Sequence, residues 1–289
     1  LAYTAFVRPG LPTIAVDRER GPSLLGGQVV RFSSDSKHYA YVGRAFRPVD
    51  GKRCFVMHDG KAGKHYSGIQ DGNLCFSPDG AGLAYVVHDK EGREVFAVLN
   101  GVEHERFRWI HLSSFGFSPN GRLHYNAMPL TAAAAGASIQ VAADPLHGEG
   151  AQGAVHVIDG KRVGAARAHL TFSADGKHSV YVEAPADETK RRIVYDGKPF
   201  PLPADLQFVA LSPKGRHWAC LAFVGESPLI EQRPAVLLVD GAKFPWKAGW
   251  VTEFTYDRPD QITARLGQAP RRHVSRVTQV ILKEKPVAK

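Results

Sequence analysis

The stretch of sequence that decides the fold is Phe76-Ser77-Pro78-Asp79-Gly80, because the chain repeats it. It returns as Phe117-Ser118-Pro119-Asn120-Gly121 and as Phe172-Ser173-Ala174-Asp175-Gly176, and weaker copies begin at Phe32 and Leu211. Copies spaced by roughly 40 residues are typical of repeat architectures. We therefore predict a fold in which one small unit recurs along the whole chain.

A second turn recurs in each unit, as an Asp-Gly or Asn-Gly dipeptide that begins at Asp59, Asn100, Asp159, Asp196 and Asp240. Such dipeptides between β-rich runs are strong hairpin signals, because a type I′ turn needs a positive φ at both central residues. No segment shows a sustained helical period, so we expect almost no helix. Each unit is therefore predicted to be an antiparallel meander of about three to four strands.

Four-stranded sheets repeated around an axis form a β-propeller, which leaves only short and protected sheet edges. A spacing of roughly 41 residues between repeats predicts seven blades in 289 residues. Six blades are the alternative, if the two terminal units share one blade. The predicted fold class is all-β, with residues 1–289 forming a single β-propeller domain.

Two segments depart from the repeat. The second turns at Asn100 and Asp159 lie 59 residues apart, and we place the excess in a long insertion at 128–153, which is either functional or a tolerated surface loop. The stretch 265–289 has seven Lys or Arg against one acidic residue, in a chain of net charge +9, and ends in a basic tail at 283–289. Such a tail attracts nucleic acid, acidic lipid headgroups or an acidic protein, unless it is only a solvated terminus.

The cysteines and the first residue provide clues to the cellular compartment in which the protein is located. Cys54, Cys75 and Cys220 lie in apolar runs without CxxC or metal-ligand spacing, which favours buried thiols. A Cys54–Cys75 disulfide is the alternative, and it would fit an oxidising compartment. Because the sequence begins at Leu1 without methionine, we expect that upstream residues were removed, with a cleaved secretory signal as one explanation. No apolar run approaches the roughly 20 residues of a membrane span, so we expect no transmembrane segment.

The sequence lacks the local motifs of common catalytic sites: GxSxG, HExxH, a Gly-rich phosphate loop and CxxCH. His38, His178 and His217 occupy one position in three repeats, which favours a structural role at the start of a strand over metal binding. Asx turns explain the repeated aspartates, since a lone Asp-Gly is not the DxDxDG series of a calcium site. We therefore expect no catalytic residue, no cofactor and no metal site.

Basic and aromatic side chains supply the candidates for partner binding. A basic cluster flanks Pro48 in what we expect to be a loop between strands, and Lys61 and Lys64 would extend it into a basic rim. Two tryptophans lie near expected turns, where exposed aromatic side chains anchor partners; packing between blades is their alternative role. The candidate partner-binding residues are Arg44, Arg47, Arg53, Trp109, Trp246, Arg271 and Arg272.

The phrase Phe76-Ser77-Pro78-Asp79-Gly80, followed by Leu83-Ala84-Tyr85-Val86, resembles the WD40-like repeat of the TolB type, the PD40 repeat. The coupled phrase Val157-Ile158-Asp159-Gly160-Lys161 is similar to uncharacterised bacterial members of that group. The resemblance covers nearly the whole chain. It implies a β-propeller from a bacterial cell envelope or a secreted complex. TolB carries an additional N-terminal domain that we do not recognise here, so its partners are not transferred.

We interpret the chain as a non-catalytic interaction or scaffold protein with a protein partner, located in the periplasm or outside the cell. A cytoplasmic location and the oligomeric state stay open. One alternative is an enzyme or small-ligand binder with its site at the central channel of the propeller. Another is a basic binder of nucleic acid or an anionic polymer that uses the C-terminal stretch 265–289.

Overall fold

The computed structural model describes residues 2–8, 11–16, 19–23, 25, 30–70, 73–130, 153–183, 191–202, 205–223, 235–246, 251–258, 261–266 and 276–281. Every regular element in these ranges is a β-strand, so the all-β prediction is confirmed there. None of the described residues belongs to a helix long and apolar enough to cross a bilayer. The chain forms two compact units, Leu1–Ala166 and Arg167–Lys289.

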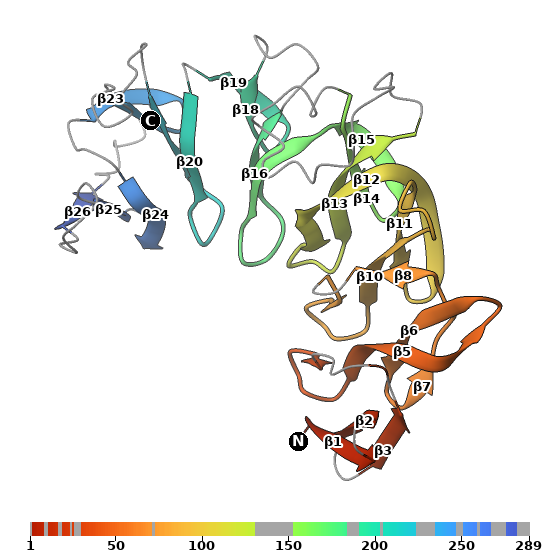
Figure 1. The fold of residues 1–289 in the computed structure, drawn as a ribbon. Coiled ribbons are helices and arrows are strands. Elements are labelled where there is room, and N and C mark those ends of the chain that lie inside the picture. The colour runs from red at the N-terminus through yellow and green to blue at the C-terminus, as the bar shows by residue number, and fades with distance from the viewer. Residues whose placement is uncertain are drawn as a thin grey trace, which may run out of the picture. The chain divides into compact units, whose positions relative to one another are not determined.

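The first unit begins with two sheets whose strands pair antiparallel in chain order (Figure 1). The first sheet has three strands: β1 (Ala2–Arg8), β2 (Leu11–Val16) and β3 (Glu19–Ser23). The second has four: β4 (Arg31–Phe32), β5 (Tyr39–Val49), β6 (Lys52–His58) and β7 (Lys61–Ala62).

An eight-stranded sheet completes the first unit. Its strands are β8 (Gly68–Ile69), β9 (Cys75–Phe76), β10 (Leu83–His88), β11 (Val95–Leu99), β12 (Val102–Phe117), β13 (Leu123–Pro129), β14 (Val155–Ile158) and β15 (Lys161–Ala165). The 16-residue strand β12 pairs with β11 up to Phe107 and with β13 from Phe107 onward. One strand therefore ends one repeat and begins the next, which merges two repeats into a single sheet.

The second unit contains three sheets with the same antiparallel order. The first consists of β16 (Arg167–Phe172), β17 (Ser179–Glu183), β18 (Arg192–Tyr195) and β19 (Lys198–Pro201). The second consists of β20 (Asp205–Leu211), β21 (Trp218–Phe223), β22 (Ala235–Val239) and β23 (Ala242–Trp246). The third consists of β24 (Val251–Arg258), β25 (Gln261–Leu266) and β26 (Arg276–Ile281).

Strand β10 shows how the sheets of the first unit are held together. Tyr85 and Val87 pack into a buried cluster with Val42 and Val56 of the preceding sheet. Val86 points to the other face and packs with Tyr125 and the buried residues around it. Because the strand is buried on both faces, neighbouring repeat sheets stack on one another and share a core.

The second turn of each repeat has the geometry that the sequence predicts. Its first central residue has φ between 46° and 50° at Asp59, Asn100, Asp159, Asp196 and Asp240. The glycine that follows each of them also has positive φ. Both central residues are therefore left-handed, as a type I′ turn requires.

The turn inside the Phe-Ser-x-Asp-Gly phrase has a different geometry. Only its last residue has positive φ, for example Gly80 at 76°. The Asp79 carboxylate accepts from the backbone N–H of Ala81 at 3.1 Å, so the expected Asx turn is confirmed. Ser77 adds a second bond, because its buried hydroxyl donates to Asp79 at 2.5 Å.

The same buried serine also accepts a hydrogen bond from the backbone just before the following strand. Ser77 Oγ accepts from the backbone N–H of Gly82 at 2.6 Å, one residue before β10. The equivalent hydroxyls of Ser33, Ser118, Ser173 and Ser212 accept from the residue at that position in the other repeats. An N–H that is shielded from water and has no acceptor is costly, and the serine supplies the acceptor at the start of the second strand in five repeats.

The aspartate of the second turn also bonds to residues at the start of the second strand of its sheet. In the sheet β4–β7, Asp59 accepts from Tyr39 N at 2.9 Å and lies 2.6 Å from His38 Nδ1. Burial acts to raise the pKa of Asp59, but the bonds from His38 and Tyr39 hold it below its ordinary value. The pairs His178–Asp196 and His217–Asp240 repeat this arrangement, and Arg122–Asp159 replaces it in another repeat. His38, His178 and His217 therefore each pair with a turn aspartate at the start of a strand, as a structural role requires.

All three cysteines are free thiols, and the Cys54–Cys75 disulfide is not formed. Cys54 belongs to the cluster around Tyr85, whereas Cys75 packs against the cluster on the other face of the same sheet. Burial raises the pKa of the Cys75 thiol to about 11 and also raises that of Cys220. Cys54 and Cys220 are buried, as expected for thiols that act as small apolar side chains.

We predict that Ser77→Ala lowers the free energy of unfolding by about 1–3 kcal/mol, because the buried Gly82 N–H loses its acceptor. Urea denaturation followed by circular dichroism measures the change. Ser67→Ala removes an exposed hydroxyl from the same unit and should change stability by less than about 0.5 kcal/mol. Equal effects of the two substitutions would contradict the role assigned to Ser77.

The Asx turns also predict acid lability. Hydrogen bonds from Ser77 and Ala81 N lower the pKa of Asp79, and bonds from Ser173 and Lys177 N lower that of Asp175. Such carboxylates stabilise the fold above their unfolded pKa near 4, and this contribution is lost as the pH falls through the lower folded pKa. The melting temperature should therefore fall between about pH 5 and pH 3.

A double variant, Asp79→Asn with Asp175→Asn, provides the control because Asn120 naturally occupies the same position. Its melting temperature should fall less over this range than that of the unmodified protein, because two of the titrating groups are gone. An identical fall in both proteins would show that these turns do not contribute to the acid response.

Candidate functional site

The hairpin formed by β5 and β6 departs from the repeat. Strand β5 has 11 residues, whereas the corresponding strands β10, β13, β17 and β21 have between 5 and 7. The extra residues lead to a left-handed turn at Asp50 and Gly51, with φ of 50° and 75°. In Figure 1 this end of the hairpin, drawn in orange, projects beyond the rest of its sheet.

The projecting part combines apolar and cationic side chains. Phe46 is 60% exposed and Val49 is 50% exposed. Arg44, Arg47 and Arg53 are also exposed, and Arg53 Nη1 donates to the carbonyl oxygen of Phe46 at 2.8 Å. Residues 44–53 carry four cationic side chains and one acidic side chain, so their net charge is +3.

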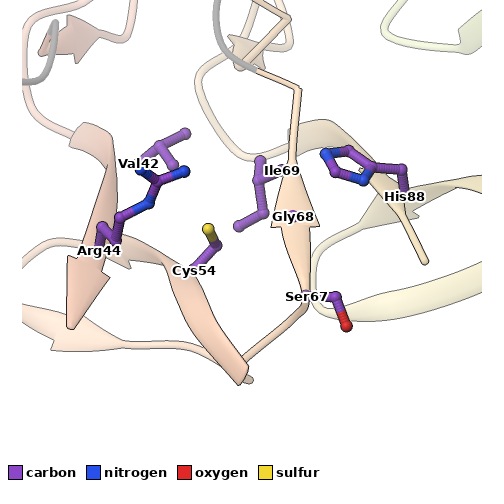
Figure 2. Close-up of a pocket in the computed structure, with 7 residues that line it drawn as sticks. All are labelled: Val42, Arg44, Cys54, Ser67, Gly68, Ile69 and His88. Atoms are coloured by element: carbon purple, nitrogen blue, oxygen red, sulfur yellow. The ribbon is translucent and has the colours of Figure 1, made fainter. Parts of the chain in front are cut away.

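A cavity of about 120 Å³ lies at the base of this hairpin. The residues that line it are Val42, Arg44, Cys54, Ser67, Gly68, Ile69 and His88. Figure 2 shows the Arg44 guanidinium and the His88 ring on either side of Ile69, with the Cys54 thiol between Arg44 and β8. Backbone bonds between Cys54 and Tyr66 hold β6 beside the segment that leads into β8.

The lining of the cavity favours an anionic group. Arg44 supplies a permanent positive charge, and no Asp or Glu lines the cavity. His88 Nδ1 lies 3.0 Å from the carbonyl oxygen of Asp89, which orients the ring. A carboxylate fits beside Arg44, because the guanidinium can donate two parallel hydrogen bonds to it.

Glycine at position 68 is required by the packing of His88. A Cβ atom on Gly68 would lie 2.0 Å from His88 Cε1, well inside van der Waals contact. The imidazole therefore lies directly against the backbone of β8. Any larger residue at position 68 would displace the ring and reshape the cavity.

The structure brings three of the seven candidate partner-binding residues together, because Arg44, Arg47 and Arg53 share the β5–β6 hairpin. Trp109 lies in the middle of β12, not near a turn, and packs half-buried against the cluster of Met128, Ala154 and Ala166. The backbone of Trp246 ends β23, and its side chain lies outside the described residues, as do Arg271 and Arg272. Most of the expected insertion and the tail at 283–289 also lie outside them.

The expected basic rim is only partly formed. Lys64 donates to Glu103 at 2.6 Å, so its charge is neutralised locally. The expected loop around Pro48 is strand β5 with its turn at Asp50-Gly51. That dipeptide is itself a type I′ signal, so the sequence held the information needed to extend the hairpin. The cavity is different, because Arg44, Ser67 and His88 line it together only through the pairing and packing of segments that are distant in sequence.

Comparisons with known proteins give matches to solved structures alone. No family model matches the sequence, and no curated protein matches it. The β-propeller domain of the trilobed protease from Pyrococcus furiosus is 12% identical, with 99% of each chain covered and a TM-score of 0.38. TolB from Acinetobacter baumannii is 16% identical, with 86% of this chain and 64% of TolB covered and a TM-score of 0.32.

Oligogalacturonate lyase from Vibrio parahaemolyticus is 10% identical, with 95% of this chain and 84% of the lyase covered and a TM-score of 0.40. Identities and TM-scores this low carry no inference about activity or partner. The function is therefore argued from the residues of this chain.

Proposed function

We propose that this chain is a non-catalytic interaction module that binds an acidic, partly apolar segment of a partner protein. The β5–β6 hairpin and the cavity at its base form the binding site. The observation that carries the proposal is the exposure of Phe46 and Val49 among four cationic side chains. A single exposed apolar side chain is ordinary on a protein surface, but two on a projecting basic hairpin mark an interaction site.

Charge and shape favour a protein segment over other ligands. A net charge of +3 over residues 44–53 attracts acidic partners. The apolar surface of Phe46 and Val49 contributes affinity that a purely anionic polymer would not use, because burying apolar area is favourable. An acidic peptide with apolar side chains satisfies both features of the hairpin.

The size of the cavity supports an anchoring role. Ligand pockets for small molecules usually measure about 300–1,000 Å³, whereas this cavity measures about 120 Å³. One carboxylate side chain of the partner fits it, held by Arg44, while the rest of the segment lies along the hairpin.

The repeat sheets supply the scaffold in this proposal. Residues 1–289 form a single propeller of seven blades, in which the eight-stranded sheet counts as two blades that share β12. The stacking of sheets across β10 and the antiparallel order of strands support that architecture. The resemblance of the repeat to the TolB type supports a bacterial protein of the periplasm or of a secreted complex.

An array of synthetic peptides with varied Glu, aromatic and aliphatic positions tests the proposal, followed by fluorescence anisotropy of the tightest peptide. Phe46→Ser and Arg44→Gln should each weaken binding by at least about tenfold, because central interface residues of these types contribute most of the affinity. Val163→Ser is the matched control, since Val163 is an exposed apolar residue of β15 in the same unit. It should leave binding unchanged.

The same assay separates the alternatives. Equal loss in Phe46→Ser and Val163→Ser, or no binding of any acidic peptide, would overturn the assignment of the hairpin. Heparin or DNA binding that weakens steeply with salt, without peptide binding, would favour the anionic-polymer alternative. Conversion of the bound peptide, followed by mass spectrometry, would show an enzyme.

A further inference from the structure

Three potential metal ligands meet at the end of the sheet β4–β7 that is opposite the projecting turn. His38, His58 and Asp59 each offer one ligand atom, and these atoms lie within 4.8 Å of one another. Asp59 Oδ2 lies 2.6 Å from His38 Nδ1 and 3.4 Å from His58 Nε2. The seven residues of β6 separate this cluster from the hairpin turn by about 20 Å, so it is distinct from the interaction site.

Only one of the five repeats with this turn combines both histidines with the aspartate. The residue before the turn is Leu99, Ile158, Tyr195 or Val239 in the other repeats, where the first has His58. The pairs His178–Asp196 and His217–Asp240 have the same geometry as His38–Asp59 but lack a second imidazole. The structural role of the pair explains His38 and Asp59, and it does not explain His58.

His58 is held in place with a nitrogen that lacks a hydrogen bond. Its ring lies 5.9 Å from the ring of His38 and 5.8 Å from that of Phe76. Its Nε2 atom is shielded from solvent and has no hydrogen-bond partner, although it faces Asp59 Oδ2. A buried polar atom without a partner calls for an explanation, and an ion bound between the three groups provides one.

The donor atoms suit a divalent transition-metal ion. Two imidazoles and one carboxylate are ligands that Zn²⁺ and its neighbours in the first row prefer. Ligand atoms at 2.0–2.2 Å from a tetrahedral zinc ion lie about 3.3 Å apart. The distance of 3.4 Å between His58 Nε2 and Asp59 Oδ2 already matches this value. The His38–Asp59 pair would open from 2.6 Å as the ion replaces their hydrogen bond.

The surrounding backbone orients the carboxylate. Asp59 Oδ1 accepts from Tyr39 N at 2.9 Å, which leaves Oδ2 directed at the two histidines. Hydrogen bonds to the outer atoms of ligands hold metal sites in shape. The type I′ turn at Asp59 and Gly60 fixes the backbone of this ligand as well.

We propose that His38, His58 and Asp59 form a binding site for a divalent transition-metal ion such as Zn²⁺. The three side chains supply three ligands, and water completes the coordination. The bound ion clamps the start of β5 to the end of β6 and stabilises this sheet. The site is independent of the proposed interaction function.

Isothermal titration of chelator-treated protein with Zn²⁺ tests the site, together with the absorption spectrum of bound Co²⁺. The unmodified protein should bind Zn²⁺ and melt at a higher temperature in its presence, since an ion that binds only the folded state stabilises it. His58→Leu, which copies Leu99 of the next repeat, should weaken this binding at least tenfold and abolish the shift in melting temperature. Its circular dichroism spectrum should be unchanged.

His217→Ala is the matched control, because His217 forms the same pair with Asp240 but has Val239 in place of the second histidine. It should leave Zn²⁺ binding unchanged. Zinc affinity in His58→Leu equal to that of the unmodified protein would overturn the proposal, as would equal losses in His58→Leu and His217→Ala.

A reciprocal variant tests the geometry by adding a site. Tyr195 stacks on His178 with ring centroids 6.4 Å apart, beside the His178–Asp196 pair. Tyr195→His should therefore create a second zinc site and raise the stoichiometry by one ion. A folded Tyr195→His protein with unchanged stoichiometry would contradict the arrangement inferred for His58.

Discussion

The structure depends on one constraint: in five repeats, the backbone N–H that opens the second strand is buried or partly buried and needs an acceptor. The serine of the Phe-Ser-x-Asp-Gly phrase provides it, with Ser33, Ser77, Ser118, Ser173 and Ser212 all nearly inaccessible to solvent. The aspartate two residues later accepts from that serine in the turns of Ser33, Ser77 and Ser173. Because the hydroxyl both donates and accepts, it joins the turn to the strand, and the strand begins at a fixed residue.

Once that start is fixed, the register of the hairpin follows. Features that differ from one repeat to another are then not needed for the fold. Strands β5 and β6 carry two such features. At one end they extend past the normal length and present Phe46, Val49 and three arginines. At the other end the residue before the second turn is His58, which the register places beside Ala40 and near His38. The same hairpin therefore carries the two features that the repeat itself does not require.

Sequence patterns predict the turns well because turn chemistry is local. Asp59-Gly60 and its equivalents have the expected backbone, and the histidine at position 38 lies at the start of a strand, as expected. Sequence patterns do not predict features that depend on contacts between residues far apart in the chain. The merging of two repeats through β12 depends on which strands pair, and the grouping of Arg44, Ser67 and His88 around one cavity depends on how two sheets pack. No local motif identifies His58, because its neighbour His38 is 20 positions away and meets it only across the hairpin.

Hydrogen exchange at single-residue resolution tests the role of the serine turns most directly. The backbone amides of His38, Gly82, Arg122, His178 and His217 donate to the buried serine hydroxyls. We predict that these amides exchange only through unfolding of their sheet, as slowly as amides in the central strands. Exchange at the rate of exposed turn amides would show that the hydroxyls do not hold the strand starts, and would contradict this account.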